Sequence, residues 1–179
     1  KRRPSYPFEN IAVAIAFSPR LESVLSEAKR ISDGFHSSLI LIHVGEKTKT
    51  KERLMEKAMK TAGINEAHTR IIWMEGDPAD TILKLCKLNI VDLLILGALE
   101  RENIFKFYLG SLARTISRKA KCSVLLLTHP SVSPSKLKKI VVNGVDSYKT
   151  IHSMGTAVYV AKTFGVKEVV VVKEVEDPV

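Results

Sequence analysis

Cysteine is scarce in this chain, which has only Cys86 and Cys122 among its 179 residues. Two isolated cysteines cannot form the disulfide framework that stabilises small secreted domains, so a reducing, cytoplasmic compartment is expected. Cys86 falls on the apolar side of a predicted helix, and Cys122 begins a predicted strand. Both are therefore predicted to be small, buried apolar side chains.

Long apolar runs and aromatic residues are also few. No stretch approaches the ~20 apolar residues of a membrane-spanning helix, and no signal peptide is visible. Aromatic residues make up 6% of the chain, and the net charge is +9. The basic residues are not interleaved with the aromatic side chains that stack on nucleic-acid bases. We therefore expect a solvated basic surface and no nucleic-acid partner.

Catalytic motifs are missing as well. The sequence contains no phosphate-binding P-loop, no Gly-x-Ser-x-Gly elbow and no Ser-Gly-Gly pyrophosphatase loop. Its five histidines lack the spacing of metal ligands. The sequence thus predicts a protein that is not an enzyme, with no catalytic residue and no metal site. His43 and Trp73 fall within predicted strands and are expected to pack in the core.

What the chain does have is a regular alternation of aliphatic runs and helical patterns. The runs are continuous rather than alternating, which is typical of strands covered on both faces by crossover helices. They predict an α/β fold with a doubly wound, five-stranded parallel sheet of the Rossmann-like kind. The predicted strands are residues 11–16, 39–44, 70–75, 92–97 and 123–127.

Helix boundaries are marked by a few polar residues and glycines. Ser18, followed by Pro19, is predicted to cap the first helix, and Asp77 is placed to cap the third. Gly63 is expected to end the second helix. The helical spacing also predicts that Ile90 and Leu112 point inward from their helices.

A second, shorter copy of the pattern follows a linker rich in Pro, Ser and Lys at residues 129–138. Placing Ile11 on Ile140 without gaps also places Phe35 on Phe164. A matching strand, helix and strand recur, which favours a true repeat. Residues 139–179 are therefore predicted to be the first β-α-β of a second domain.

The start of the chain differs from both repeats. Residues 1–8 form a basic leader, and the chain does not begin with Met. A basic, proline-containing segment of this kind is typical of a juxtamembrane linker. We therefore predict that residues 9–128 form the first domain and that the chain is the cytosolic part of a membrane transporter.

The chain contains three distinctive motifs, GDPADTIL at 76–83, VDLLILGA at 91–98 and GSLARTISRKAKCSVLLL at 110–127. In this order and spacing they resemble the universal stress protein family. Residues 76–83 (GDPADTIL) resemble its Gly-Asp-Pro turn into the third helix, and residues 91–98 (VDLLILGA) the strand before its nucleotide loop. Residues 110–127 (GSLARTISRKAKCSVLLL) resemble its Gly-Ser helix and final strand. The chain looks like a tandem member whose second copy is incomplete. The resemblance implies a fold similar to the adenine nucleotide alpha hydrolases, frequent dimers through the last strand, and either ATP or AMP binding or its loss.

The resemblance also implies candidate nucleotide-binding residues. Gly97, Gly110 and Ser111 keep the family pattern at the two ends of the loop, and Val44 matches the position whose backbone faces the base. The amides of Gly110 and Ser111 would lie at a helix N-terminus, which favours an anion. Turns with a purely structural role would carry glycines at the same positions. Gly97 and Gly110 are therefore interpreted equally well as structural turn residues and as nucleotide-binding residues.

Two positions depart from the pattern of the ATP binders. Ala16 stands where these binders tend to have an aspartate, and Glu100 where they have a glycine. If Glu100 pointed inward, its carboxylate would repel a phosphate charge by roughly 4 kcal/mol at ~4 Å and an effective dielectric near 20, before screening. Arg101, the next residue, would offset part of this repulsion.

These residues are compatible with two functions. The first is a non-catalytic regulatory or stress-response module of the universal stress protein type with a degenerate nucleotide loop. The second is a sensor that binds ATP or AMP, with at most slow hydrolysis. The expected partners are a second copy in a homodimer, a paired tandem domain, or a membrane transporter to which the chain is attached.

Overall fold

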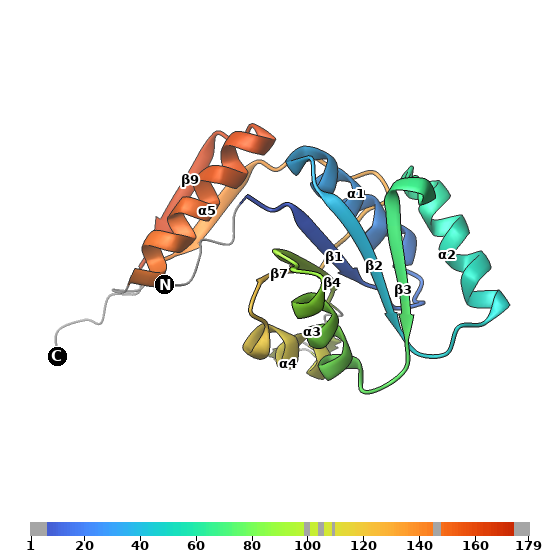
Figure 1. The fold of residues 1–179 in the computed structure, drawn as a ribbon. Coiled ribbons are helices and arrows are strands. Elements are labelled where there is room, and N and C mark those ends of the chain that lie inside the picture. The colour runs from blue at the N-terminus through green and yellow to red at the C-terminus, as the bar shows by residue number, and fades with distance from the viewer. Residues whose placement is uncertain (1–6, 99–100, 104–105, 109, 145–147, 174–179) are drawn as a thin grey trace. The chain divides into compact units, whose positions relative to one another are not determined.

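The computed structural model describes residues 7–98, 101–103, 106–108, 110–144 and 148–173 (Figure 1). The chain divides into two compact units, Pro7–Pro134 and a second that contains Ser135 onward. Each unit is described by itself. No helix in the described parts of either unit is both long enough and apolar enough to cross a membrane.

The first unit contains a five-stranded parallel sheet with the order β3-β2-β1-β4-β7. The doubly wound, Rossmann-like α/β fold predicted from the continuous aliphatic runs is confirmed. Helices α1 and α2 cover one face of the sheet, and α3 and α4 cover the other (Figure 1). The strands are β1 (Asn10–Ala14), β2 (Ser38–Val44), β3 (Thr69–Met74), β4 (Leu93–Gly97) and β7 (Ser123–Leu127).

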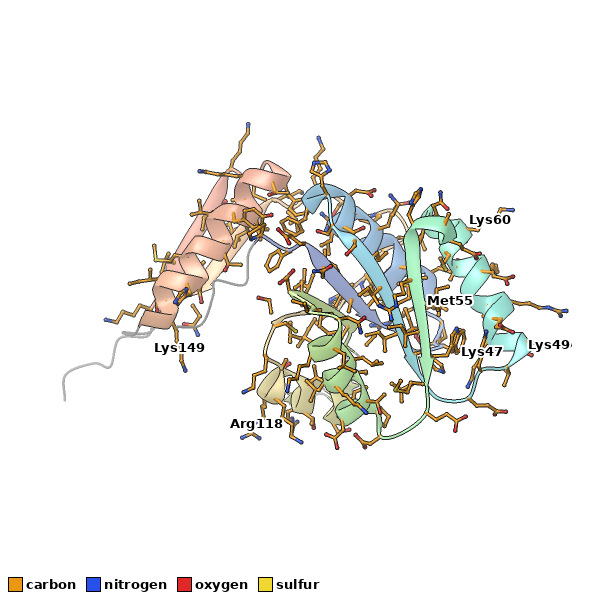
Figure 2. All side chains as sticks on the ribbon, in the orientation of Figure 1. Lys47, Lys49, Met55, Lys60, Arg118 and Lys149 are labelled. Atoms are coloured by element: carbon orange, nitrogen blue, oxygen red, sulfur yellow. The ribbon has the colours of Figure 1, made fainter. Side chains whose placement is uncertain are left out.

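Each face of the sheet carries its own layer of apolar side chains. On the side of α3 and α4, Ile82 and Ile116 pack with Ala12, Ile42 and Leu94 of the strands. On the other side, Met55 points from α2 toward the sheet, whereas Lys49 and Lys60 project into solvent (Figure 2). The helices are α1 (Leu21–Phe35), α2 (Lys49–Ala62), α3 (Pro78–Leu88) and α4 (Ser111–Lys119), with a short 3₁₀ turn η1 (Glu66–His68).

Two predicted helix boundaries are confirmed. The Asp77 carboxylate accepts a hydrogen bond from the backbone N–H of Asp80 at 2.9 Å, and Pro78 occupies the first turn of α3. Gly63 ends α2 in the left-handed conformation with φ 68°. Glycine adopts this conformation without the steric cost that a Cβ atom adds.

Several local predictions are wrong. Helix α1 begins at Leu21 after an Arg20 that makes no side-chain cap, because the Ser18 hydroxyl instead accepts from the N–H of Arg20 at 3.3 Å in a local turn. Ile90 lies beyond the end of α3 with φ 50°, so it is 76% exposed rather than inward. Leu112 is also exposed, since it lies in the first turn of α4. Cys122 is only half-buried.

The segment after β4 has more structure than the predicted loop. Two short antiparallel strands, β5 (Arg101–Asn103) and β6 (Lys106–Tyr108), pair with each other between β4 and α4. The hydrophobic pattern missed this hairpin because strands of three residues are too short for a period to show.

The second unit is a single β-α-β formed by β8 (Lys139–Asn143), α5 (Tyr148–Phe164) and β9 (Glu168–Val172), with the two strands parallel. It reproduces details of β1-α1-β2. Helices α1 and α5 end at Phe35 and Phe164, and the next residues, His36 and Gly165, are both left-handed, with φ 55° and 65°. The second strand then differs by one residue, since Asn10 pairs with Ser38 but Lys139 pairs with Glu168.

The second unit leaves much of its apolar surface exposed. On α5 the exposed apolar side chains recur at helical spacing, and both strands of the unit, β8 and β9, carry exposed valines. Ala157, Ala161 and Val142 are buried. The exposed apolar residues of β8, α5 and β9 are Val141, Ile151, Met154, Val158, Val169, Val171 and Val172.

Candidate functional site

A pocket of about 370 Å³ opens at the carboxyl ends of β1, β2 and β4. The chain runs from β1 to one side of the sheet and returns through β4 on the other, so this is the switch point where α/β sheets bind ligands. The volume lies in the range of roughly 300–1,000 Å³ found for small-molecule sites. The lining residues are Ala14, Ile15, Ala16, Phe17, Ser18, Arg20, Leu21, Val24, His43, Val44, Pro78, Ile82, Leu96, Gly97, Ala98 and Leu112.

Three of the predicted site positions meet in this pocket. Ala16, Val44 and Gly97 all line it, from the segments that end β1, β2 and β4. Strand β1 ends at Ala14, so Ala16 lies two residues beyond the strand rather than within it. A Cβ atom added to Gly97 would lie 3.1 Å from the side chain of Val24. Close packing against α1 therefore accounts for a glycine at position 97 whether or not a ligand binds.

An aromatic cluster forms one side of the pocket. The His43 ring is 4.7 Å from Phe17 and 5.1 Å from Trp73, edge to face in both cases, and Phe17 and Trp73 stack at 5.8 Å. Lys47 lies 6.0 Å from the Trp73 ring, near the end of β3 (Figure 2). His43 is buried, as predicted, whereas Trp73 is half-buried, because β3 is an edge strand.

His43 has a defined proton on one ring nitrogen. Its Nδ1 lies 3.1 Å from the carbonyl oxygen of Ile15, and a carbonyl oxygen only accepts, so Nδ1 donates. The other nitrogen, Nε2, is buried and finds no hydrogen-bond partner among the described residues. A Cβ atom on Gly45 would lie 3.1 Å from Nε2, so a glycine at position 45 gives this ring its room.

Charge in the lining comes from one residue. Arg20 carries the single formal charge among the described residues that line the pocket. Its Nη1 donates to the carbonyl oxygen of Thr128 at 3.0 Å, which holds the exposed guanidinium near the end of β7. The remaining N–H groups of this side chain are available to a carboxylate or phosphate. The pocket thus combines apolar walls with a cation.

The predicted phosphate positions lie beside the pocket rather than in its lining. Gly110 precedes α4 and Ser111 is its first residue, and both are exposed. A Cβ atom on Gly110 would meet no other atom within 4 Å, so packing in the described parts of the structure does not require a glycine there. The next residue, Leu112, does line the pocket. The backbone of Arg101 belongs to β5, and Glu100 lies outside the described residues.

Sequence reasoning missed Phe17, Arg20 and His43 as pocket residues. Phe17 and Arg20 follow the first strand, and the rule that ligands bind beyond the carboxyl ends of parallel strands would have pointed to them. The proximity of His43 to Phe17 depends on which strands are neighbours, which the sequence does not state. No group of three or more metal-ligating side chains occurs within the described ranges.

Comparisons with known proteins agree on one family. Residues 7–128 match the universal stress protein family. The crystal structure of a universal stress protein in complex with cAMP is 22% identical and has a TM-score of 0.57, over 69% of this chain and 98% of that one. A universal stress protein from Archaeoglobus fulgidus is 18% identical, with a TM-score of 0.56, over 68% and 99% of the two chains.

One solved structure extends over both units. A functionally unknown protein from Pseudomonas aeruginosa PAO1 is 17% identical and has a TM-score of 0.74, over 94% of this chain and 62% of that one. At these identities the likeness to solved structures concerns the fold alone. The search of curated proteins gave no match.

Proposed function

The chain belongs to the universal stress protein family, and on this premise we propose that it is a non-catalytic regulatory module that binds an adenine mononucleotide. The observation that carries this function is the pocket at the switch point of the sheet. Its apolar walls suit a planar base, and Arg20 supplies a positive charge for an anionic group. A protein of the same fold that is in complex with cAMP gives further support.

We assign the parts of the nucleotide to the parts of the site as follows. The base lies against the apolar walls near the backbone of Val44, and the sugar lies near Ala16 and Gly97. The phosphate faces Arg20 and the amides of Gly110 and Ser111, at the positive end of the α4 dipole.

A single phosphate suits this chain better than three. The side chain of Ala16 offers no polar atom to a sugar or a metal ion, and the loop carries Glu100 in place of a glycine. A triphosphate would bring more negative charge toward that carboxylate. We therefore propose a degenerate nucleotide loop, no dedicated catalysis and at most slow hydrolysis of ATP.

Isothermal titration calorimetry of the full chain with AMP, cAMP, ADP and ATP tests the function. We expect micromolar binding of AMP, weaker binding of ATP, and a loss of roughly 10- to 150-fold in AMP affinity in Arg20→Gln, since a hydrogen bond to a charged group contributes about 1.5–3 kcal/mol. Arg118→Gln is the matched control, because Arg118 is an exposed cation on the last turn of α4. Absence of binding by the wild-type chain contradicts the proposal.

A second candidate is a regulatory module that binds no nucleotide and acts only through protein partners. The contact between Gly97 and Val24 favours it, because packing alone then explains a glycine in the loop. Absence of heat with all four nucleotides would select this candidate. Binding that is lost in Gly110→Val, with the fold intact by circular dichroism, would reject it.

We also propose that the chain is a tandem member, with a first domain at 9–128, a linker at 129–138 and the first β-α-β of a second domain at 139–179. The matching helix ends and left-handed residues of the two β-α-β units support this. So does the exposed apolar surface of the second unit, which further strands would cover. A solved structure that aligns with both units adds support.

The partner that we propose for the first unit is a second copy, joined through β7. This strand lies at one edge of the five-stranded sheet, and its aliphatic residues are half-buried. Edge strands offer unpaired backbone groups to another chain. Sedimentation velocity over a range of concentrations tests the dimer. Attachment to a membrane transporter on its cytosolic side stays a prediction from the basic leader, most of which lies outside the described residues.

A further inference from the structure

The fold brings the two cysteines of the chain together. Cys86 lies on α3 and is 6% exposed, within the apolar cluster between the sheet and α3. Cys122 lies one residue before β7 and packs against that same cluster. Backbone contacts hold the two residues close. The carbonyl oxygen of Cys86 accepts from the N–H of Val91 at 2.9 Å, and the N–H of Ser123, next to Cys122, donates to the carbonyl oxygen of Asp92 at 3.0 Å. Both thiols are free. Residues far apart in the sequence thus form a thiol pair.

The two thiols have different surroundings. The hydrogen bond from Cys86 lowers the pKa of the Cys122 thiol, and the backbone N–H groups of Cys122 and Leu94 act in the same direction. Burial and the Asp92 carboxylate act against this shift. The same hydrogen bond, together with burial, raises the pKa of Cys86. Cys122 is therefore the thiol that ionises first, and Cys86 is the donor beside it.

Exposure gives the two residues different access to reagents. Cys122 is half-buried and is the more accessible of the two residues. Cys86 is covered by the core. A partly exposed thiolate beside a second thiol is the arrangement found in oxidant-sensitive cysteine pairs.

We propose that Cys86 and Cys122 are a redox-sensitive pair that a hydroperoxide converts to an intramolecular disulfide. The Cys122 thiolate attacks the peroxide, so that an S–O bond forms, the O–O bond breaks and the leaving oxygen takes a proton to become water or an alcohol. Cys86 then loses its proton and attacks the sulfenic sulfur. An S–S bond forms, the S–O bond breaks, and the leaving hydroxide takes that proton to become water. The two thiols lose two electrons and two protons in total.

The disulfide would enclose a defined part of the domain. The chain from Cys86 to Cys122 contains β4, the β5-β6 hairpin and α4. Oxidation would therefore fix the end of α3 to the start of β7 and restrict the unfolding of everything between them. This chemistry needs no nucleotide, so it is separate from the function of the pocket.

Peptide mapping of the full chain tests the pair. The reduced protein is treated with hydrogen peroxide, blocked with iodoacetamide and digested with trypsin. We expect one cross-linked species that joins residues 85–87 to residues 122–136 and that dithiothreitol separates. Before oxidation, Cys122 should be alkylated at least ~10-fold faster than Cys86 at neutral pH, because only thiolates react.

Single variants assign the two roles. In Cys86→Ser, oxidation should stop at a Cys122 sulfenic acid that a cyclic 1,3-diketone traps. In Cys122→Ser, peroxide should leave Cys86 reduced. Circular dichroism verifies that both variants are folded. A disulfide between two chains on a non-reducing gel, or a Cys122 sulfinic acid without any cross-link in the wild-type protein, would overturn the assignment.

Discussion

The β-α-β at the start of the first unit and the β-α-β of the second unit share their elements but not their burial. Val13 and Leu41 of the first unit are fully buried, whereas Val171, which corresponds to Leu41, is 47% exposed. Both units have two parallel strands and a helix that ends in a left-handed residue. Local sequence thus suffices to form the elements, but burial depends on the neighbouring strands and helices that only the first unit has.

The largest effect that separates the two units is expected at corresponding core positions. Leu41 pairs with Val13, and Val171 pairs with Val142. Leu41→Ala should lower the free energy of unfolding by about 2–5 kcal/mol, because it leaves a cavity in a closed core. Val171→Ala should change it by less than ~0.5 kcal/mol, since the side chain already contacts solvent.

Urea denaturation separates these outcomes. The fluorescence of Trp73 reports on the unfolding of the first unit. Far-ultraviolet circular dichroism reports on the loss of all helices, including α5 of the second unit. If Val171→Ala lowered the free energy of unfolding as much as Leu41→Ala, a partner would have to cover β9 in solution. The comparison between the two units would then hold only for the isolated chain.

An intermediate effect is expected where each helix ends. His36 and Gly165 have nearly the same left-handed φ, and both are exposed. Gly165→Ala should destabilise the second unit by about 1–2 kcal/mol, since a Cβ atom is unfavourable in this conformation and meets no other atom within 4 Å that would compensate. His36→Gly should stabilise the first unit by a similar or smaller amount, because it removes that cost. Thermal unfolding followed by circular dichroism measures both changes in stability. If both variants stabilised or both destabilised the protein, the C-terminal ends of α1 and α5 would not be equivalent.

The smallest effect is expected at the first paired position of each unit. Lys139 and Glu168 form an ion pair of 2.7 Å, whereas in the first unit Ser38 donates a hydrogen bond to Asn10 at 2.9 Å. Glu168→Gln should destabilise by roughly 0.2–1 kcal/mol at low salt, because the pair is about half exposed, and by almost nothing at about 1 M salt. Ser38→Ala is the neutral control, and its effect should not depend on salt. A loss in Glu168→Gln that persists at high salt would contradict an exposed, screened pair.

Much of the fold could be predicted because the signals are local. Continuous aliphatic runs specify strands that are buried on both faces, and Asp77 and Gly63 mark helix ends through the conformations that they favour. The same kind of local signal also gave wrong or missing predictions at two places. Ile90 follows the helical period but lies after the chain has turned out of α3, and the hairpin of β5 and β6 is too short for its pattern to be seen.

The site could be predicted only in part, because it depends on the order of the strands. The family resemblance supplied Ala16, Val44 and Gly97, which line one pocket. Neither Phe17 beside His43 nor Cys86 beside Cys122 follows from spacing in the sequence. Each pair joins segments that meet only when β1, β2, β4 and β7 have taken their places in the sheet.

The hydrogen bond between Arg20 and Thr128 has a consequence for the order of folding. It joins residues 108 positions apart, at the entrance of the first helix and the exit of the last strand of the first unit. Contacts of such long range form late, because closing a long loop costs entropy before the contact forms. During synthesis from the N-terminus, Arg20 is therefore anchored at the pocket only after β7 has left the ribosome and docked at the edge of the sheet. The cation of the pocket is thus fixed in place only when the first unit has finished folding.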